Sequence, residues 1–262
     1  MRAAVAEWEG GDPPLRGIRV LTLAVNLPGP VAASRLCAMG ASVIKVEPPG
    51  GDPLALMCPG YYRDLSAGQE VARLDLKDQK DRASLDDMDL LLTASWPAAL
   101  GRLGLSWPEL HADFMRLCQV AIVGHPHPNE DAPGHDLTHQ ARFGTLSPPG
   151  MPSVLVAEPL RQGLTAPGGV LGNGFPGYGL YRGREGHVAL GALEPHSWER
   201  LSQELGVDGQ RQDLGSISET EQWEEWAADR DLPLATVRDV EQNEVEASAS
   251  QWRRTSTRGE DE

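Results

Sequence analysis

The chain has 262 residues, of which 40% are hydrophobic, and this is enough to bury a core for one large domain or for a domain with an appendage. Its 23 basic and 38 acidic residues give a formal charge of -15, which argues against nucleic acid or an anionic membrane surface as a partner. The three cysteines form no CxxC pair, the first residues lack the apolar core of a signal peptide, and no stretch resembles a membrane span, so we expect a cytoplasmic protein.

The N-terminal half alternates strand and helix patterns. Residues 17–24 are a short apolar run that predicts a buried strand, and this run ends at the turn residues NLPGP. Residues 31–40 have helical spacing and a terminal glycine, and residues 41–53 supply a second strand that Pro-Pro-Gly-Gly stops. A strand, a helix and a strand in this order predict a βαβ unit with parallel strands.

The same alternation continues along the chain. Residues 72–78, 87–95 and 119–124 each predict a strand, and residues 107–118 have apolar positions at helical intervals. The sequence therefore predicts an α/β fold with a Rossmann-like, doubly wound parallel sheet and helices on both faces.

The second half of the chain has a different composition. Residues 125–179 are dense in glycine and proline, which predicts loops and turns. Residues 179–193 predict a hairpin around Arg-Gly-Arg-Glu-Gly, and residues 194–206 and 218–233 predict two helices. Ser218 and Glu221 have the spacing of a capping box at the start of the second helix.

Several motifs, taken in order, resemble the family III CoA-transferases, the CaiB/BaiF-type group that also contains the 2-methylacyl-CoA racemases. The opening LRGIRVLTLAVNLPGPVAASRLCAMGASVIKVEPPGGDP is similar to the opening of that family, and ARLDLKD, ALGRLGLSWPEL, APGHD, GALEP and QWEEWAADRDLPLATVRD follow in the family's order. The resemblance covers about residues 15–239. It implies the doubly wound fold predicted above, together with a second domain that is reduced here, because family members are longer and the missing helices fall between Glu158 and Gly168.

The resemblance also implies a division of the chain. We expect an N-terminal extension at residues 1–14, a Rossmann-like CoA-binding domain at 15–150, a shortened connection at 151–178, a small-domain remnant with the C-terminal helices at 179–246, and a flexible tail at 247–262. Two chains interlock in full-length relatives, so the expected protein partner is a second copy of this chain or a related chain.

The candidate coenzyme A site lies at the NLPGP turn and the IKVEP strand. The turn joins a predicted strand to a helix N-terminus, where free backbone N–H groups and the helix dipole favour an anion. The alternative is that Gly29 and Pro30 only shape a tight turn. The residues that the resemblance assigns to coenzyme A are Asn26, Pro28, Gly29, Pro30, Lys45, Glu47 and Pro48.

Four residues are candidates for catalysis. His135 and Asp136 belong to the GHD motif, and a histidine at this place resembles the racemase branch, since imidazole can move a proton near neutral pH. Glu158 stands where the family carries its catalytic aspartate, and Glu194 resembles the glutamate that orients the racemase histidine. The alternatives are an ordinary loop histidine at 135, a turn residue at 136 and a solvated carboxylate at 158.

Two functional hypotheses follow from the resemblance. The first is an enzyme acting on a coenzyme A thioester as substrate, without metal or redox cofactor, which either transfers CoA between carboxylic acids or epimerises a 2-methylacyl-CoA. The second is a non-catalytic subunit that keeps the fold as a binding or scaffold partner. The change to Glu158, the shortened centre and the replacement of the family's basic motifs by LSAGQEVA and TASWPAAL favour the second hypothesis.

Overall fold

The computed structural model forms two compact units, which are described one at a time. The first contains the described residues up to Pro133, and the second begins at Gly134. The residues that the structure describes are 11–75, 85, 87–125, 128–144, 174–183, 186–206 and 220–238.

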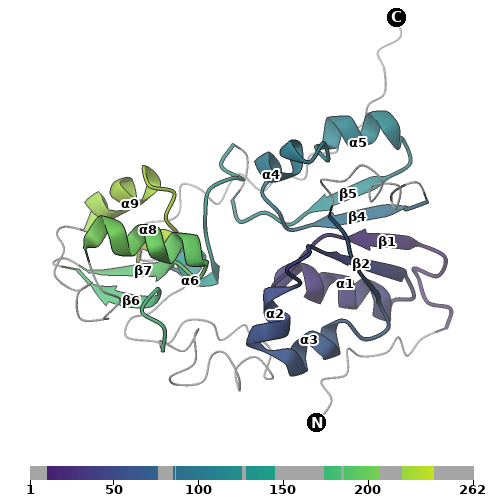
Figure 1. Ribbon diagram of the computed structural model, residues 1–262, viewed down its shortest axis with the longest axis horizontal. Helices are drawn as coiled ribbons and strands as arrows, with labels where there is room; N and C mark the ends of the chain where they lie inside the picture. The colour runs from purple at the N-terminus through teal and green to yellow at the C-terminus, as the bar shows by residue number, and fades with distance from the viewer. Residues whose placement is uncertain are drawn as a thin grey trace, which may run out of the picture. The chain divides into compact units, whose positions relative to one another are not determined.

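The first unit is built on a five-stranded parallel sheet with the strand order β3-β2-β1-β4-β5 (Figure 1). The order reverses between β1 and β4, which is the arrangement of a doubly wound sheet. The predicted fold class is therefore confirmed. The strands are β1 (Arg19–Thr22), β2 (Ser42–Glu47), β3 (Glu70–Arg73), β4 (Leu90–Thr93) and β5 (Cys118–Ala121).

Proline marks the start of each helix in this unit. A proline occupies one of the first two positions of every one of them, where its fixed φ suits a helix and its missing N–H costs no hydrogen bond. The first helix was expected at residues 31–40 and begins three residues earlier. The helices are α1 (Pro28–Ala38), α2 (Pro53–Met57), α3 (Pro59–Leu65), α4 (Pro97–Arg102) and α5 (Trp107–Asp113).

Both faces of the sheet are covered, as the apolar strands require. Neighbouring residues of one strand belong to two separate cores, because successive side chains point to opposite faces. Val20 and Leu92 pack with Ala33 of α1 on one face, whereas Leu21 and Leu91 pack on the other with leucines of α4 and α5.

In its described residues, the second unit combines a three-stranded antiparallel sheet with three helices. The strands β6 (Tyr178–Arg182) and β7 (His187–Gly191) form the predicted hairpin, and β8 (Leu234–Thr236), which the sequence did not reveal, pairs with β7. The helices are α6 (Asp136–Arg142), α8 (Pro195–Leu205) and α9 (Thr220–Ala228).

The helix α6 corrects one expectation. Its segment was predicted as loop, but seven residues after the Gly-His pair form a helix that packs against β7 and β8. Burial of Leu137 and Ala141 on one side of the helix stabilises it, even though its neighbourhood is rich in glycine and proline.

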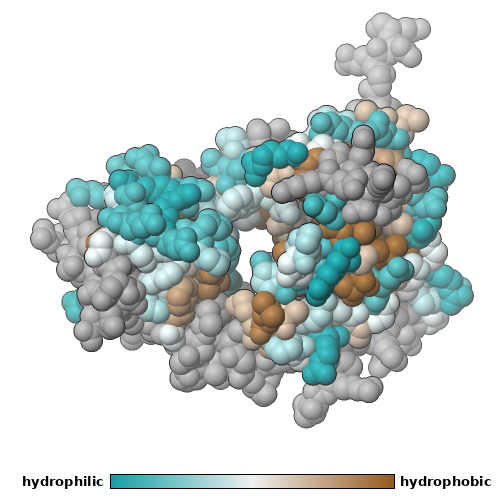
Figure 2. Space-filling model, viewed as in Figure 1, coloured by the Kyte–Doolittle hydropathy of each residue, from teal (hydrophilic) through white to brown (hydrophobic). Residues whose placement is uncertain are grey.

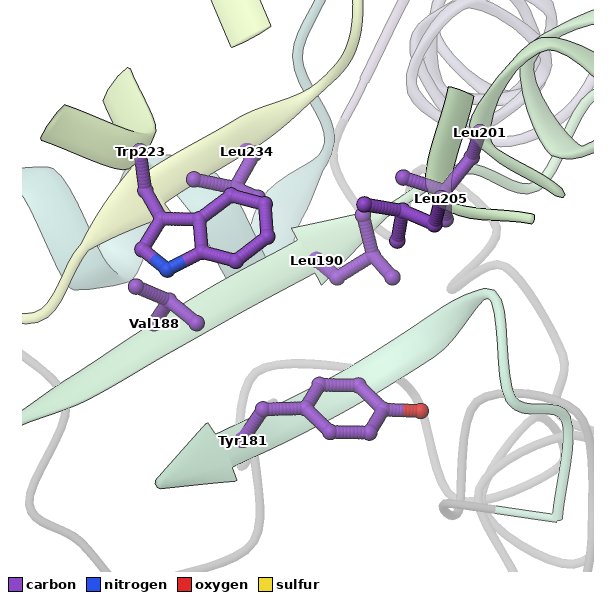
Figure 3. Close-up of a pocket in the computed structure, with 7 residues that line it drawn as sticks. All are labelled: Tyr181, Val188, Leu190, Leu201, Leu205, Trp223 and Leu234. Carbon is purple, nitrogen blue, oxygen red and sulfur yellow. The ribbon is translucent and has the colours of Figure 1, made fainter. Parts of the chain in front are cut away.

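A small cavity lies in the core of the second unit, between the sheet and the helices α8 and α9 (Figure 3). Its volume is about 20 Å³, which is room for about one water molecule. The apolar lining offers a water no partner, and the hydroxyl of Tyr181 donates to the carbonyl of Pro176 instead. Figure 2 shows hydrophilic side chains on the outer surface of α8 and α9. The lining residues are Tyr181, Val188, Leu190, Leu201, Leu205, Trp223 and Leu234.

Candidate active site

A tight turn follows β1 at the place where the strand order reverses. In doubly wound sheets, ligands bind outside the carboxyl ends of the strands at this point. Asn26 has a φ of 65° in the turn, in the left-handed region that asparagine tolerates better than most residues. A Cβ atom at Gly29 would collide with the Cβ of Ala24 and approach that of Ala94, at the end of β4, to 3.5 Å. Glycine is therefore required at position 29.

The predicted coenzyme A residues of this turn differ in accessibility. Asn26 and Pro28 are exposed, whereas Gly29 and Pro30 are buried and shape the turn. Because Pro28 and Pro30 have no N–H, the first turn of α1 offers a ligand only the N–H groups of Leu27 and Gly29. The exposed amide side chain of Asn26 is thus an important polar group at this edge of the sheet.

A buried ionic network lies beside this turn. The Nζ atom of Lys45 is 2.9 Å from Oε1 of Glu47 and 2.5 Å from Oδ2 of Asp52, and Lys45 and Glu47 are each only 1% exposed. The hydroxyl of Tyr62 donates to Oε1 of Glu47 at 2.7 Å, and the Tyr62 ring lies 4.5 Å from Nζ. The structure therefore places Lys45 and Glu47 inside the fold, while Pro48 is exposed; contact of the three with coenzyme A stays a prediction.

The network changes the acidity of its members. Burial alone would lower the pKa of Lys45, but the hydrogen bonds to Asp52 and Glu47 raise it above its ordinary value. Burial alone would raise the pKa of Glu47, but the hydrogen bonds from Lys45 and Tyr62 lower it. Lys45 and Glu47 therefore both stay ionised at neutral pH.

In the second unit, His135 and Glu194 come together from segments 59 residues apart. His135 directly precedes α6, and Glu194 directly precedes α8. The Nε2 atom of His135 is 3.0 Å from Oε2 of Glu194, and their side chains are 25% and 39% exposed. Since Nε2 is engaged, Nδ1 is the ring nitrogen that could exchange a proton with a substrate.

Local contacts fix the position of this histidine. The backbone N–H of His135 donates to Oγ1 of Thr138 at 3.0 Å, and the Thr138 hydroxyl donates back to the His135 carbonyl at 2.9 Å. A Cβ atom on Gly191 would lie 3.2 Å from Cβ and 3.3 Å from Cδ2 of His135, so the end of β7 makes room for the ring.

The carboxylates of Glu194 and Asp136 differ in their hydrogen-bond partners and in the direction in which their pKa is shifted. Burial would raise the pKa of Glu194, but its hydrogen bond with His135 lowers it below its ordinary value. Loss of hydration raises the pKa of Asp136, and Oδ2 of that residue accepts a hydrogen bond from Gln140 at 2.7 Å. The structure thus joins His135 to Glu194, whereas Asp136 bonds within its own helix.

Comparison with known proteins decides the family. The model of CoA-transferase family III matches residues 15–166, more than half of the chain. The chain belongs to CoA-transferase family III. The family's parallel sheet and the resemblance drawn from the motifs are thereby confirmed.

Curated relatives within the family are longer. The chain is 33% identical over 139 residues to the cinnamoyl-CoA:phenyllactate CoA-transferase of Clostridium sporogenes, covering 47% of this chain and 34% of that protein. It is 34% identical over 135 residues to a subunit of the succinyl-CoA:(R)-benzylsuccinate CoA-transferase of Thauera aromatica, covering 45% of this chain and 33% of that protein. The chain spans between a third and a half of the length of the first curated relatives it matches.

Solved structures are similar to the chain at lower identity. A CaiB/BaiF family protein from Brucella suis is 17% identical, with a TM-score of 0.48, over 88% of this chain and 85% of that one.

One of the four candidate catalytic residues lies outside the described residues. Glu158 falls within residues 145–173, which the structure does not describe. Among the described residues, no three His, Cys, Asp or Glu side chains are grouped to hold a metal ion, and no helix has the length and apolar character needed to cross a membrane.

The sequence missed four residues that the structure brings to these sites: Asp52, Tyr62, Thr138 and Gly191. A signal existed for Asp52, because an aspartate before a helix-starting proline is a frequent N-cap. Tyr62 and Gly191 act through tertiary contacts, for which one sequence carries no pattern.

Proposed function

We propose that this chain acts on a coenzyme A thioester and that His135 moves a proton at the carbon next to the thioester carbonyl. The observation that carries the proposal is the 3.0 Å approach of His135 to Glu194. A carboxylate that accepts a hydrogen bond from one ring nitrogen fixes the tautomer, which leaves the other nitrogen to act as a base.

The proposed reaction is the epimerisation of a 2-methylacyl-CoA. Nδ1 of His135 takes the α-proton, and the electron pair of the broken C–H bond moves into the thioester as an enolate. A proton then returns to the opposite face of the same carbon from an acid, for which we propose Glu158. We give Asp136 an accessory role beside the base, because it is the first residue of α6 and follows His135 directly.

A second candidate reaction is the transfer of CoA between carboxylic acids, which is favoured by the similarity of the chain to two CoA-transferases. In that reaction the Glu158 carboxylate attacks the thioester carbonyl, the C–S bond breaks, and the CoA thiolate leaves behind an acyl anhydride. The thiolate then attacks the Glu158 carbonyl of the anhydride, which releases the donor acid and leaves a glutamyl-CoA thioester. The carboxylate of the acceptor acid attacks this thioester to form a second anhydride and frees the thiolate. The thiolate finally attacks the acceptor acyl carbonyl, which gives the new acyl-CoA and restores the Glu158 carboxylate.

For the binding of coenzyme A we propose the turn formed by Asn26, Pro28, Gly29 and Pro30, with Lys45, Glu47 and Pro48 behind and beside it. A carrier role without catalysis is the alternative, favoured by the short span of the chain against its relatives. In either case we propose a cytoplasmic protein that pairs with a second copy or a related chain, as the subunit name of one relative suggests.

The experiment combines binding and exchange. Calorimetric titration with free CoA and with a 2-methylacyl-CoA measures binding, and incubation of the thioester in D₂O followed by mass spectrometry measures α-deuterium uptake. Saturable binding with deuterium uptake supports epimerisation, and binding with acyl exchange onto an added acid supports transfer. Binding without either reaction leaves the carrier role, and no binding at millimolar CoA overturns the proposal.

The role of Gly191 gives a prediction for this assay. Gly191→Ala places a methyl group against Cβ and Cδ2 of His135, so we expect the ring to shift from Glu194 and the maximal rate of α-deuterium uptake to fall about 10-fold. The affinity for free CoA should not change. Gly101→Ala in α4, where a Cβ would meet nothing, is the matched control. An unchanged rate in Gly191→Ala would show that the ring tolerates the methyl group.

A further inference from the structure

Asp52 connects three parts of the first unit that the sequence keeps apart. It is 2% exposed, and its carboxylate is fully engaged. Oδ1 accepts hydrogen bonds from the backbone N–H of Asn26 at 3.0 Å and from that of Leu54 at 2.9 Å, and Oδ2 binds Lys45. One side chain therefore caps α2, pairs with the buried lysine and holds the turn after β1.

The hydrogen bond from the backbone N–H of Asn26 to Asp52 matters because Asn26 has a left-handed backbone conformation. A left-handed φ in a residue other than glycine is unfavourable, and surrounding contacts have to maintain it. The bond from Asn26 N–H to a buried carboxylate is such a contact, and a charged acceptor makes it stronger than a bond between neutral groups.

Asp52 is itself held rigidly. Oδ2 of Asp52 is paired with Lys45. Lys45 also binds Glu47, which accepts a hydrogen bond from Tyr62, so these contacts hold the Asp52 carboxylate in one position. The chain of contacts runs from the end of β2 through the loop before α2 to the exposed amide of Asn26. The three charged members of this chain of contacts, Lys45, Glu47 and Asp52, are buried. Tyr62 is half-buried, and Asn26 is exposed.

From this geometry we infer that Asp52 is a positioning residue for coenzyme A: it fixes the Asn26 turn in the conformation that receives the ligand. The inference rests on the proposed function, because it assigns to Asp52 the shape of the proposed CoA-binding turn. With two prolines in the first turn of α1, few backbone donors remain, so the direction of the Asn26 amide and of the Leu27 and Gly29 N–H groups decides the affinity.

Two variants separate this role from simple support of the fold. Asp52→Ser keeps a good N-cap for α2 but cannot reach Asn26 and Lys45 together. Asp52→Asn keeps an oxygen that can accept from both N–H groups, but its amide NH2 replaces the oxygen that pairs with Lys45, which then has only Glu47. Asp64→Ser, at an exposed position of α3, is the matched control for the change of aspartate to serine.

The measurements are the Kd for free CoA by calorimetry and the hydrogen-exchange rate of the Asn26 amide by NMR, each on protein shown to be folded by circular dichroism. We expect Asp52→Ser to raise the Kd at least about 10-fold and to speed the amide exchange by a similar factor, because the turn loses its acceptor. Asp52→Asn keeps an acceptor for the Asn26 N–H, so we expect both quantities to rise less than in Asp52→Ser, whereas a general loss of stability from the broken pair with Lys45 would affect the two variants alike.

The outcomes are distinguishable. If folded Asp52→Ser binds CoA as the wild type does, or if its Asn26 amide keeps the wild-type exchange rate, the inference is overturned. If the wild type binds no CoA, the proposed function fails, and the amide exchange alone still decides whether Asp52 holds the turn.

Discussion

Replacement of Lys45 by methionine is expected to lower the free energy of unfolding by about 3–5 kcal/mol, because it removes the buried cation between Glu47 and Asp52 and leaves only the exposed Arg73, 3.9 Å from Oε2 of Glu47. Methionine has a similar length and fills the space of the lysine stem, so loss of charge, not loss of volume, is tested. Urea denaturation followed by circular dichroism measures the effect. Arg16→Met, which breaks an ion pair on the surface with Asp12, should cost little.

The pH dependence of this variant gives an independent test. The lowered pKa of Glu47 means that its ionised form stabilises the wild type above the ordinary value of 4.5, and this stabilisation is lost as the pH falls through the folded-state pKa. Without Lys45, burial of Glu47 is opposed only by the hydrogen bond from Tyr62 and by Arg73, so we expect its pKa to be higher than in the wild type and protonation to relieve the variant. The difference in stability between the two proteins should therefore shrink as the pH is lowered from 7 towards 4. A difference that stays constant would mean that the buried charges are not its origin.

Replacement of His135 by alanine is expected to reduce α-deuterium uptake into a 2-methylacyl-CoA by about 10²- to 10⁴-fold, the usual contribution of a general base. Glu194→Gln should reduce it less, since the glutamate orients the ring and does not take the proton. The Kd for free CoA should remain within about 2-fold in both variants, because the proposed CoA turn lies in the other unit.

His187→Ala is the matched control for this experiment. It removes a histidine from the same unit, at the end of β7 opposite to Gly191. Its uptake rate should equal that of the wild type. Equal rates in His135→Ala and the wild type would exclude the histidine from the reaction and leave the transfer chemistry of Glu158 as the candidate to test.

The sequence predicted the first unit well because its strands are continuous apolar runs between turn residues. In the first unit, the strand predicted at 17–24 matches β1 and the strand predicted after Ala41 matches β2. In the second unit, the hairpin predicted at 179–193 matches the β6-β7 pair. Boundaries were less certain: the strand expected at 72–78 is found at Glu70–Arg73, since pairing with β2, not composition, sets its register.

The short helices were harder to predict. The helices α2, α3 and α6 have five to seven residues, too few for a hydrophobic period to stand out, and their stability comes from caps and burial. The residues of the candidate sites were also predictable only in part. The motifs identified His135 and Glu194, but the burial of Lys45 and the role of Asp52 depend on contacts between segments that one sequence does not connect.

The strand order has a consequence for how the chain folds during its synthesis. β1 is central in the first sheet, yet one neighbour, β2, follows within about 20 residues, while the other, β4, begins only at Leu90. A ribosome adds about 5–20 residues per second, so the half-sheet β3-β2-β1 has an open edge for about 1–4 seconds while the chain from Arg73 to Thr93 is made. The buried side chains of Val20 and Leu21 are apolar, and that edge is the place where a chaperone would protect the nascent protein.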